Sequence, residues 1–144
     1  MDESTSCLLG RAYYLHLGLL DRALTKAGID QTIRPAMCNV LCVLFDEDHQ
    51  TISSVAEQVR VAKSTMTATV DRLRKQGLIR VERDRADRRA QRLILTEKGR
   101  EFEKPLRAVL VEIEDAVASG LEPNEQENLR ALLTKAVETM DLAT

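Results

Sequence analysis

Two short helical patterns separated by only three residues constrain the fold of this chain most. The first pattern ends at about Val59, and the second occupies residues 63–76 with apolar side chains at helical spacing. The link, residues 60–62, is long enough only for a tight turn. Two short helices joined in this way predict a helix-turn-helix.

The residues at the helix boundaries agree with this prediction. Ser54 and Glu57 match a capping box, which is expected to open the first helix. Gly77 is expected to end the second, because glycine readily adopts the left-handed conformation that follows many helices. Six apolar residues would form the inner faces: Val55, Ala56, Val59, Met66, Val70 and Leu73.

Two strands are predicted directly after these helices, at residues 80–83 and 91–95. In the second strand, Leu93 and Leu95 alternate with Arg92 and Ile94. The seven residues between the strands, 84–90, are mostly charged and form the expected tip of a hairpin. A helix-turn-helix followed by such a hairpin is a winged helix.

Positive charge is concentrated in this central part of the chain. Residues 60–100 contain thirteen Lys or Arg and five Asp or Glu, whereas the rest of the chain contains eight basic and eighteen acidic residues. The formal net charge of −2 therefore conceals a basic centre, which is the electrostatic pattern of a nucleic-acid-binding surface. Aromatic residues make up only 3% of the chain, which argues against a stacking platform for single strands.

The helix at 63–76 begins with small polar side chains suited to the major groove of DNA. Hydroxyl groups can contact base edges or phosphates, and small methyl groups can approach thymine. The residues expected on or near its open face are Ser64, Thr65, Thr67 and Ala68, with Lys63, Arg72 and Arg74 within reach of phosphates. Taken alone, this helix also fits a solvated amphipathic helix.

The hairpin makes DNA binding the better interpretation. Five arginines on one small ribbon repel one another unless an anion binds them: Arg83, Arg85, Arg88, Arg89 and Arg92. An arginine on a narrow tip suits the minor groove, where the potential is most negative. Asp87 lies two residues before Arg89 and is positioned to orient its guanidinium group.

Helices are predicted on both sides of the winged helix. Apolar periodicity indicates helices at residues 6–27, 32–45 and 97–119, and a last helix beginning near Pro123. With six Gly and three Pro, the chain has little room for long loops. The expected fold class is mainly α, an α+β winged helix-turn-helix with helices at both ends.

The sequence resembles the MarR family of transcriptional regulators. The resemblance rests on four segments and extends over the flanking helices: residues 51–57, 63–67, 71–79 and 87–99, the last containing Asp87-Arg88-Arg89-Ala90 and Leu93-Ile94-Leu95-Thr96-Glu97-Lys98-Gly99. Ala62 is a departure, because a capping Ser or Asp is more usual there.

The resemblance implies a single domain over residues 1–144. Residues 1–33 and 98–144 would supply dimerisation helices, and 34–97 the winged lobe that binds DNA. A homodimer would then place two lobes in successive major grooves of a pseudo-palindromic site, with Arg89 in the minor groove. Such regulators usually repress, and often release DNA when a small ligand or an oxidant changes the lobe spacing.

The resemblance also suggests a pocket for a small-molecule effector between the dimer helices and the lobe. Its candidate residues are Tyr13, His16, Arg34, Met37, Cys38 and Leu41, although packing in the core is the alternative for most of them. Cys7 resembles in position the sensing cysteine of the hydroperoxide-responsive branch. A thiol-based redox sensor is therefore one alternative, and an inert buried thiol is the other.

Other functions find less support in the sequence. No catalytic motif is recognised, so we expect neither an enzyme nor a cofactor, and the two histidines give no metal-binding pattern. A winged-helix module that binds only proteins is an alternative, but it does not explain the arginines of the wing. No signal peptide or membrane-spanning run is seen and the three cysteines give no disulfide framework, so a cytoplasmic location is expected.

Overall fold

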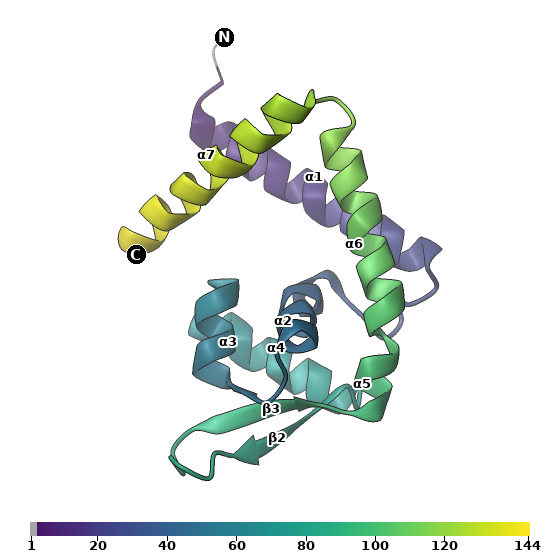
Figure 1. Cartoon of the computed structure of the whole chain (residues 1–144), viewed down its shortest axis with the longest axis vertical. Coiled ribbons are helices and arrows are strands. Elements are labelled where there is room, and N and C mark those ends of the chain that lie inside the picture. Colours follow the sequence, from purple (N-terminus) through teal and green to yellow (C-terminus); the bar gives the residue numbers. More distant parts are fainter. Residues whose placement is uncertain (1–2) are drawn as a thin grey trace.

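The computed structural model describes residues 3–144 and has two parts (Figure 1). One part is a lobe of shorter helices and a small sheet, and the other is an arch of long helices above it. The elements in chain order are α1 (Thr5–Lys26), α2 (Pro35–Asp46), β1 (Gln50–Thr51), α3 (Ile52–Val59), α4 (Lys63–Lys75), β2 (Ile79–Arg83), β3 (Gln91–Leu95), α5 (Glu97–Glu101), α6 (Glu103–Ala118) and α7 (Pro123–Leu142). The predicted winged helix-turn-helix with flanking helices is confirmed.

One hydrophobic core joins the lobe to the arch. Its completely buried residues include one from each of six elements: Leu24, Leu41, Val55, Leu73, Leu93 and Leu106. The elements cannot separate without exposing this apolar surface, which would cost about 25 cal/mol for each Å². Helices α1 and α6 therefore hold the lobe through the same core that forms the lobe itself.

Helix α2 begins later than the sequence analysis predicted. We expected it to start at Thr32, but its first residue is Pro35. The reason is steric, because a residue before proline is disfavoured in the helical region. Arg34 is accordingly extended, with φ −105° and ψ 156°.

The predicted capping box at Ser54 is wrong. Thr51 caps α3 instead, and its side chain accepts a hydrogen bond from the Ser54 backbone N–H at 3.1 Å. Thr51 also belongs to β1 and pairs with Arg92 of β3. Because this strand pairing holds Thr51 in the extended conformation that an N-cap needs, the helix begins at Ile52.

The sheet is antiparallel, with three strands in the order β1-β3-β2. Strands β2 and β3 were predicted, and β2 begins one residue earlier than expected, at Ile79. The two-residue strand β1 was not predicted. It places the chain entering α3 directly beside the ribbon that forms the wing (Figure 1).

The single helix predicted over residues 97–119 is two helices, α5 and α6, interrupted at Phe102. Pro105 explains the interruption, because it has no N–H to donate to the carbonyl of Glu101 four residues earlier. The Phe102 N–H turns back to the Gly99 carbonyl at 3.2 Å, a tighter turn than that of an α-helix.

Candidate nucleic-acid interface

The exposed start of α4 is the first part of the candidate interface. Lys63, Ser64, Thr65, Thr67 and Ala68 are all exposed, while Met66 and Val70 on the opposite face are buried. Ala62 precedes the helix and provides no capping hydrogen bond, as its side chain dictates. The first backbone N–H groups of α4 consequently have no side-chain cap from Ala62 and are free to bind an anion.

The basic residues in the second half of α4 have a different environment. Arg72 and Arg74 are exposed, as predicted for phosphate contacts. Arg74 pairs with Asp71 at 3.2 Å, and Lys75 pairs with the same carboxylate at 2.9 Å. These contacts, the hydrogen bond from Lys75 first, lower the pKa of Asp71, so the carboxylate stays ionised and offsets part of the positive charge.

The wing is the second part of the interface and projects from the lobe (Figure 1). The predicted contact at its tip is present: one carboxylate oxygen of Asp87 accepts hydrogen bonds from the backbone N–H of Arg89 at 3.1 Å and from its Nε at 3.4 Å. The Arg89 side chain is 94% exposed. Its guanidinium group is therefore oriented without being buried, which suits a group that must enter a narrow groove.

The other predicted wing residues, Arg83, Arg85 and Arg88, are exposed as well. All twelve residues predicted to contact DNA therefore lie on the surface: Lys63, Ser64, Thr65, Thr67, Ala68, Arg72, Arg74, Arg83, Arg85, Asp87, Arg88 and Arg89. Of the twelve, Arg74 pairs with Asp71 and Arg89 pairs with Asp87. Their individual roles at DNA stay predictions.

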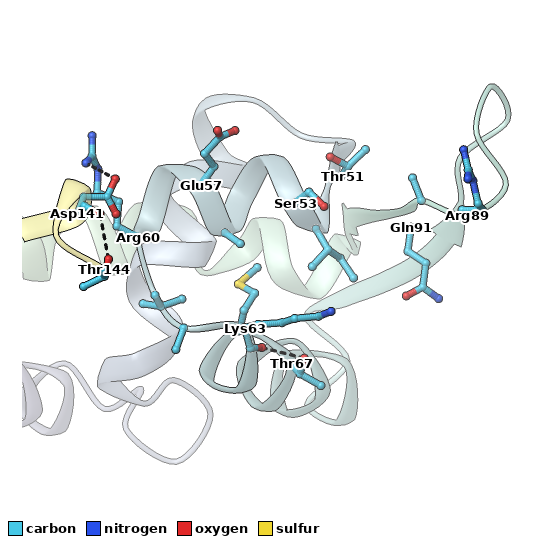
Figure 2. Close-up of a pocket in the computed structure, with 16 residues that line it drawn as sticks. Thr51, Ser53, Glu57, Arg60, Lys63, Thr67, Arg89, Gln91, Asp141 and Thr144 are labelled. Atoms are coloured by element: carbon cyan, nitrogen blue, oxygen red, sulfur yellow. Dashed lines mark hydrogen bonds and ion pairs between the residues drawn. The ribbon is translucent and has the colours of Figure 1, made fainter. Parts of the chain in front are cut away.

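A groove of about 1050 Å³ connects the wing to the start of α4 (Figure 2). Of the predicted residues, Lys63, Thr67 and Arg89 line it, together with the first turn of α3. Arg89 lies at one end of the groove in Figure 2 and Arg60 lies at the other. The groove therefore brings together residues that are 26 positions apart in the sequence, from Lys63 to Arg89.

The residues at the far end of this groove were not predicted from the sequence. Arg60, in the turn between α3 and α4, pairs with Asp141 of α7 at 2.9 Å. Arg60 has a positive φ of 53°, a conformation that few residues other than glycine adopt. The turn of only three residues was the one available signal, because such a turn commonly needs a left-handed residue.

Asp84 is a second residue that the sequence analysis missed. It is a buried charged residue at the base of the wing, only 5% exposed. Backbone N–H groups of Asp87 and Ala86 donate to it and Arg92 contacts it, and these interactions lower its pKa. An aspartate two residues before the turn it stabilises is a recognisable sequence signal.

The six residues predicted for an effector pocket lie in two different environments. Met37, Cys38 and Leu41 are buried in the core, while Tyr13, His16 and Arg34 are exposed. They line neither the groove described above nor a smaller cavity of about 410 Å³ between α3 and Arg92. The effector pocket therefore stays a prediction.

The three cysteines are free thiols in three environments. Cys7 is exposed near the start of α1, so it is not a buried thiol of this chain. Burial raises the pKa of Cys38 to about 12, and the neighbouring Cys42 adds to this increase. Cys42 is half-buried and its pKa is also raised, mainly by burial, so both of these thiols are poor nucleophiles at neutral pH.

No helix within residues 3–144 is long and apolar enough to cross a membrane. No group of three or more His, Cys, Asp or Glu side chains comes together there in a way that could hold a metal ion.

Comparison with known proteins identifies the family. A model of the MarR family matches residues 35–90, from the start of α2 to the wing. Over 105 residues the chain is 30% identical to YkoM of Bacillus subtilis, described as an uncharacterised HTH-type transcriptional regulator. That alignment covers 71% of this chain and 66% of YkoM. The chain belongs to the MarR family.

Solved structures extend this assignment over nearly the whole chain. BpsR of Bordetella bronchiseptica, whose DNA binding is regulated by 6-hydroxynicotinic acid, has a TM-score of 0.85 and 27% identity, with 94% of each chain covered. The transcriptional repressor CouR, solved on a 23-mer DNA duplex, has a TM-score of 0.80 and 21% identity, covering 93% of this chain and 92% of CouR. The fold of this MarR-family protein is thus that of known transcriptional regulators.

Proposed function

We propose that this MarR-family protein binds double-stranded DNA as a homodimer, with α4 in the major groove and the wing tip in the minor groove. The observation that carries the proposal is Arg89, which is 94% exposed at the tip of a two-stranded ribbon and oriented by Asp87. An exposed arginine with a fixed orientation gains little by pairing with its neighbour in water. It gains much more in a narrow groove lined with phosphates.

The spacing of the interface supports binding to a duplex rather than to an isolated anion. The start of α4 and the tip of the wing line one groove, with Arg89 at its end. This arrangement allows a phosphate backbone to pass between a helix in the major groove and an arginine in the minor groove. The thirteen basic residues of the segment 60–100 supply the long-range attraction.

The unpartnered apolar surface of the long helices supports dimerisation. Within the described chain, α7 has no buried residue, although six of its large apolar side chains are exposed to solvent. Other large apolar side chains are exposed on α1 and α6. The exposed residues on these three helices include Leu8, Leu15, Val111, Val117, Leu129, Leu132, Leu133, Val137 and Met140. Residues 1–33 and 98–144 are therefore proposed to pack against the same helices of a second copy.

The dimer gives repression and its release a physical basis. Two lobes that are held at a fixed separation fit only operators whose half-sites have the matching spacing. A small molecule that binds between the helices and a lobe would favour a different separation and lower the affinity for DNA. BpsR responds to 6-hydroxynicotinic acid, which makes a small-molecule effector a reasonable expectation for this chain.

The test is to titrate labelled DNA from upstream of the protein's own coding sequence with the protein. Binding is measured by fluorescence anisotropy at several salt concentrations. The logarithm of the binding constant should fall linearly with the logarithm of salt concentration, by roughly 0.9 for each phosphate contact. Arg89→Ala should weaken binding by about 1–3 kcal/mol, or roughly 5- to 150-fold.

Lys104→Ala is the matched control, because it removes an exposed positive charge from α6 rather than from the lobe. It should change the affinity by less than about twofold. Salt-independent binding, or an Arg89→Ala variant that binds as tightly as the wild type, would contradict the proposal.

A further inference from the structure

The base of the wing contains a polar cluster that none of the predicted DNA contacts explains. The Asp84 side chain is only 7% exposed, although the ribbon around it is open to solvent. One of its carboxylate oxygens accepts hydrogen bonds from the backbone N–H groups of Ala86 at 2.7 Å and Asp87 at 2.9 Å. The other oxygen accepts a hydrogen bond from Nε of Arg92. Burying a carboxylate in this way requires all of these partners.

Arg92 connects this cluster to the body of the lobe. Its guanidinium group donates to Asp84 and also to the backbone carbonyl of His49, just before β1. His49 lies in a turn with a positive φ of 61°. Its backbone N–H donates to Asp48, which in turn accepts a hydrogen bond from Leu95 at the end of β3. These hydrogen bonds therefore attach β3 to residues 48–49 at two positions, at Arg92 near its start and at Leu95 at its end.

The hydrogen bonds continue from this cluster to the wing tip. The Asp84 N–H donates to the Ala90 carbonyl at 2.9 Å, and the Ala90 N–H donates to the Asp87 carbonyl at 3.0 Å. The Asp87 side chain then accepts two hydrogen bonds from Arg89. Each residue of the series fixes the next, so the tip has a defined shape although it has almost no apolar contacts.

We propose that Asp84 and Arg92 are positioning residues for DNA binding. They fix the turn at residues 84–90, so that Arg89 is already ordered before it enters the minor groove. This inference rests on the proposed function, because it assigns a role to the support of the proposed contact. A loop of seven residues that is free in solution loses conformational entropy when DNA orders it. A loop that is already ordered avoids this cost and binds more tightly.

Electrostatics and positioning predict opposite effects for Asp84→Ala. The substitution removes a negative charge near the phosphates, so electrostatics alone predicts tighter binding. Positioning predicts weaker binding, because Ala86, Asp87 and Arg92 lose the acceptor that fixes the turn. We expect Asp84→Ala to weaken DNA binding by about 3- to 30-fold, a part of the loss expected for Arg89→Ala.

A double-mutant cycle tests whether Asp84 acts through Arg89. In an Arg89→Ala background, Asp84→Ala should change the affinity by less than about twofold, since the residue that it positions is gone. Asp71→Ala is the matched control, because Asp71 is a carboxylate of α4 that pairs with Arg74 and Lys75 and not with the wing. Its effect should be the same with and without Arg89. Equal effects of Asp84→Ala in both backgrounds, or tighter binding, would overturn the proposal.

A measurement without DNA separates this inference from the proposed function. Amide hydrogen exchange of Ala86 and Asp87 should become at least about tenfold faster in Asp84→Ala, while the core amides of α4 should keep their protection. Unchanged exchange at these two amides would overturn the positioning role even if the protein binds DNA. If exchange is faster in Asp84→Ala but the wild type binds no DNA, the ordering of the wing by Asp84 is supported and the proposed function is contradicted.

Discussion

Replacing Gly99 by alanine should destabilise the protein, because the position has no room for a side chain. Gly99 lies in α5, where the helix approaches the backbone just before β2. A Cβ atom added there would lie 2.1 Å from the carbonyl oxygen of Leu78 and 3.1 Å from its carbonyl carbon. Because both neighbours are backbone atoms, no side-chain rotation can relieve the contact.

The size of the effect follows from the movement that this contact forces. Carbon and oxygen need a separation near 3.3 Å, so α5 and Leu78 must move apart by roughly 1 Å. The hydrogen bond from the Thr96 N–H to the Leu78 carbonyl, now 3.0 Å, would lengthen with them. Overpacking costs about 1–3 kcal/mol, and a lost hydrogen bond costs about 1 kcal/mol more. The better helix propensity of alanine returns about 1 kcal/mol. The expected net loss is therefore about 1–3 kcal/mol.

Thermal unfolding followed by circular dichroism measures this loss. For a chain of this length, each kcal/mol lowers Tm by about 3 °C, so Gly99→Ala should melt roughly 3–9 °C below the wild type. Both proteins must be compared at one concentration, because association changes Tm. Gly120→Ala is the control, since a Cβ at Gly120 would have no heavy atom within 4 Å. A Gly99→Ala variant that melts within about 2 °C of the wild type would refute the close approach of α5 to Leu78.

Three further predictions concern single groups. A thiol reagent should label the exposed Cys7 in the folded protein. It should label Cys38, whose pKa is about 12, only when the protein unfolds. Rapid labelling of Cys38 in the folded protein would contradict its burial. Thr51→Ala should lower the free energy of unfolding by about 1 kcal/mol in a denaturant titration, because α3 loses its N-cap; an unchanged midpoint would argue against that cap. Backbone hydrogen bonds lower the pKa of Asp84, so the stability that its ionised form supplies is complete above the ordinary value of 3.8 and is lost as pH falls through the lower folded value. The NMR shift of the Ala86 amide should consequently stay constant from about pH 8 to about pH 5 and change only below the ordinary value, and a transition near neutral pH would contradict this assignment.

The elements predicted correctly from the sequence are those that local physics determines. Helix α4 has an apolar stripe, and Gly77 follows it with a positive φ of 72°. The contact between Asp87 and Arg89 spans only two residues, so a sequence pattern is enough to predict it. Absence of a side-chain cap at Ala62 likewise follows from the residue itself. In each of these cases both partners lie close together in the sequence.

The errors arise where a distant part of the chain determines the local structure. Thr51 becomes the cap of α3 because β3 pairs with it across 41 positions of sequence, as the register with Arg92 shows. The Ser54 capping box looked better locally, and the strand pairing overrode it. Asp84 is only partly such a case, because Ala86 and Asp87 are local partners and only the anchoring of Arg92 at His49 depends on a distant residue. The break at Phe102 differs, since Pro105 is visible in the sequence and its effect on the preceding turn was overlooked.

The structure also constrains how an effector would change the separation of two lobes. Ion pairs lie on both sides of the interruption at Phe102: Arg100 contacts Asp48 at 2.6 Å before it, and Arg107 contacts Asp46 at 2.8 Å after it. Exposed pairs of this kind are individually weak. They act here beside buried residues of α6, Leu106, Val109 and Ile113, which belong to the same core as the lobe.

The interruption therefore bends the path from α5 to α6 without freeing the lobe from α6. In a homodimer, a change in lobe separation would arise where the long helices have exposed apolar surface, which is on α7 and on the exposed sides of α1 and α6. If the protein is the proposed homodimer, each lobe and its α6 move as one body, and an effector acts by shifting that body against the partner. Substitutions in the α1 and α7 surfaces should then alter the response to the effector. Substitutions in the core of the lobe should instead lower the free energy of unfolding, and should change the effector response only when the fold is already weakened.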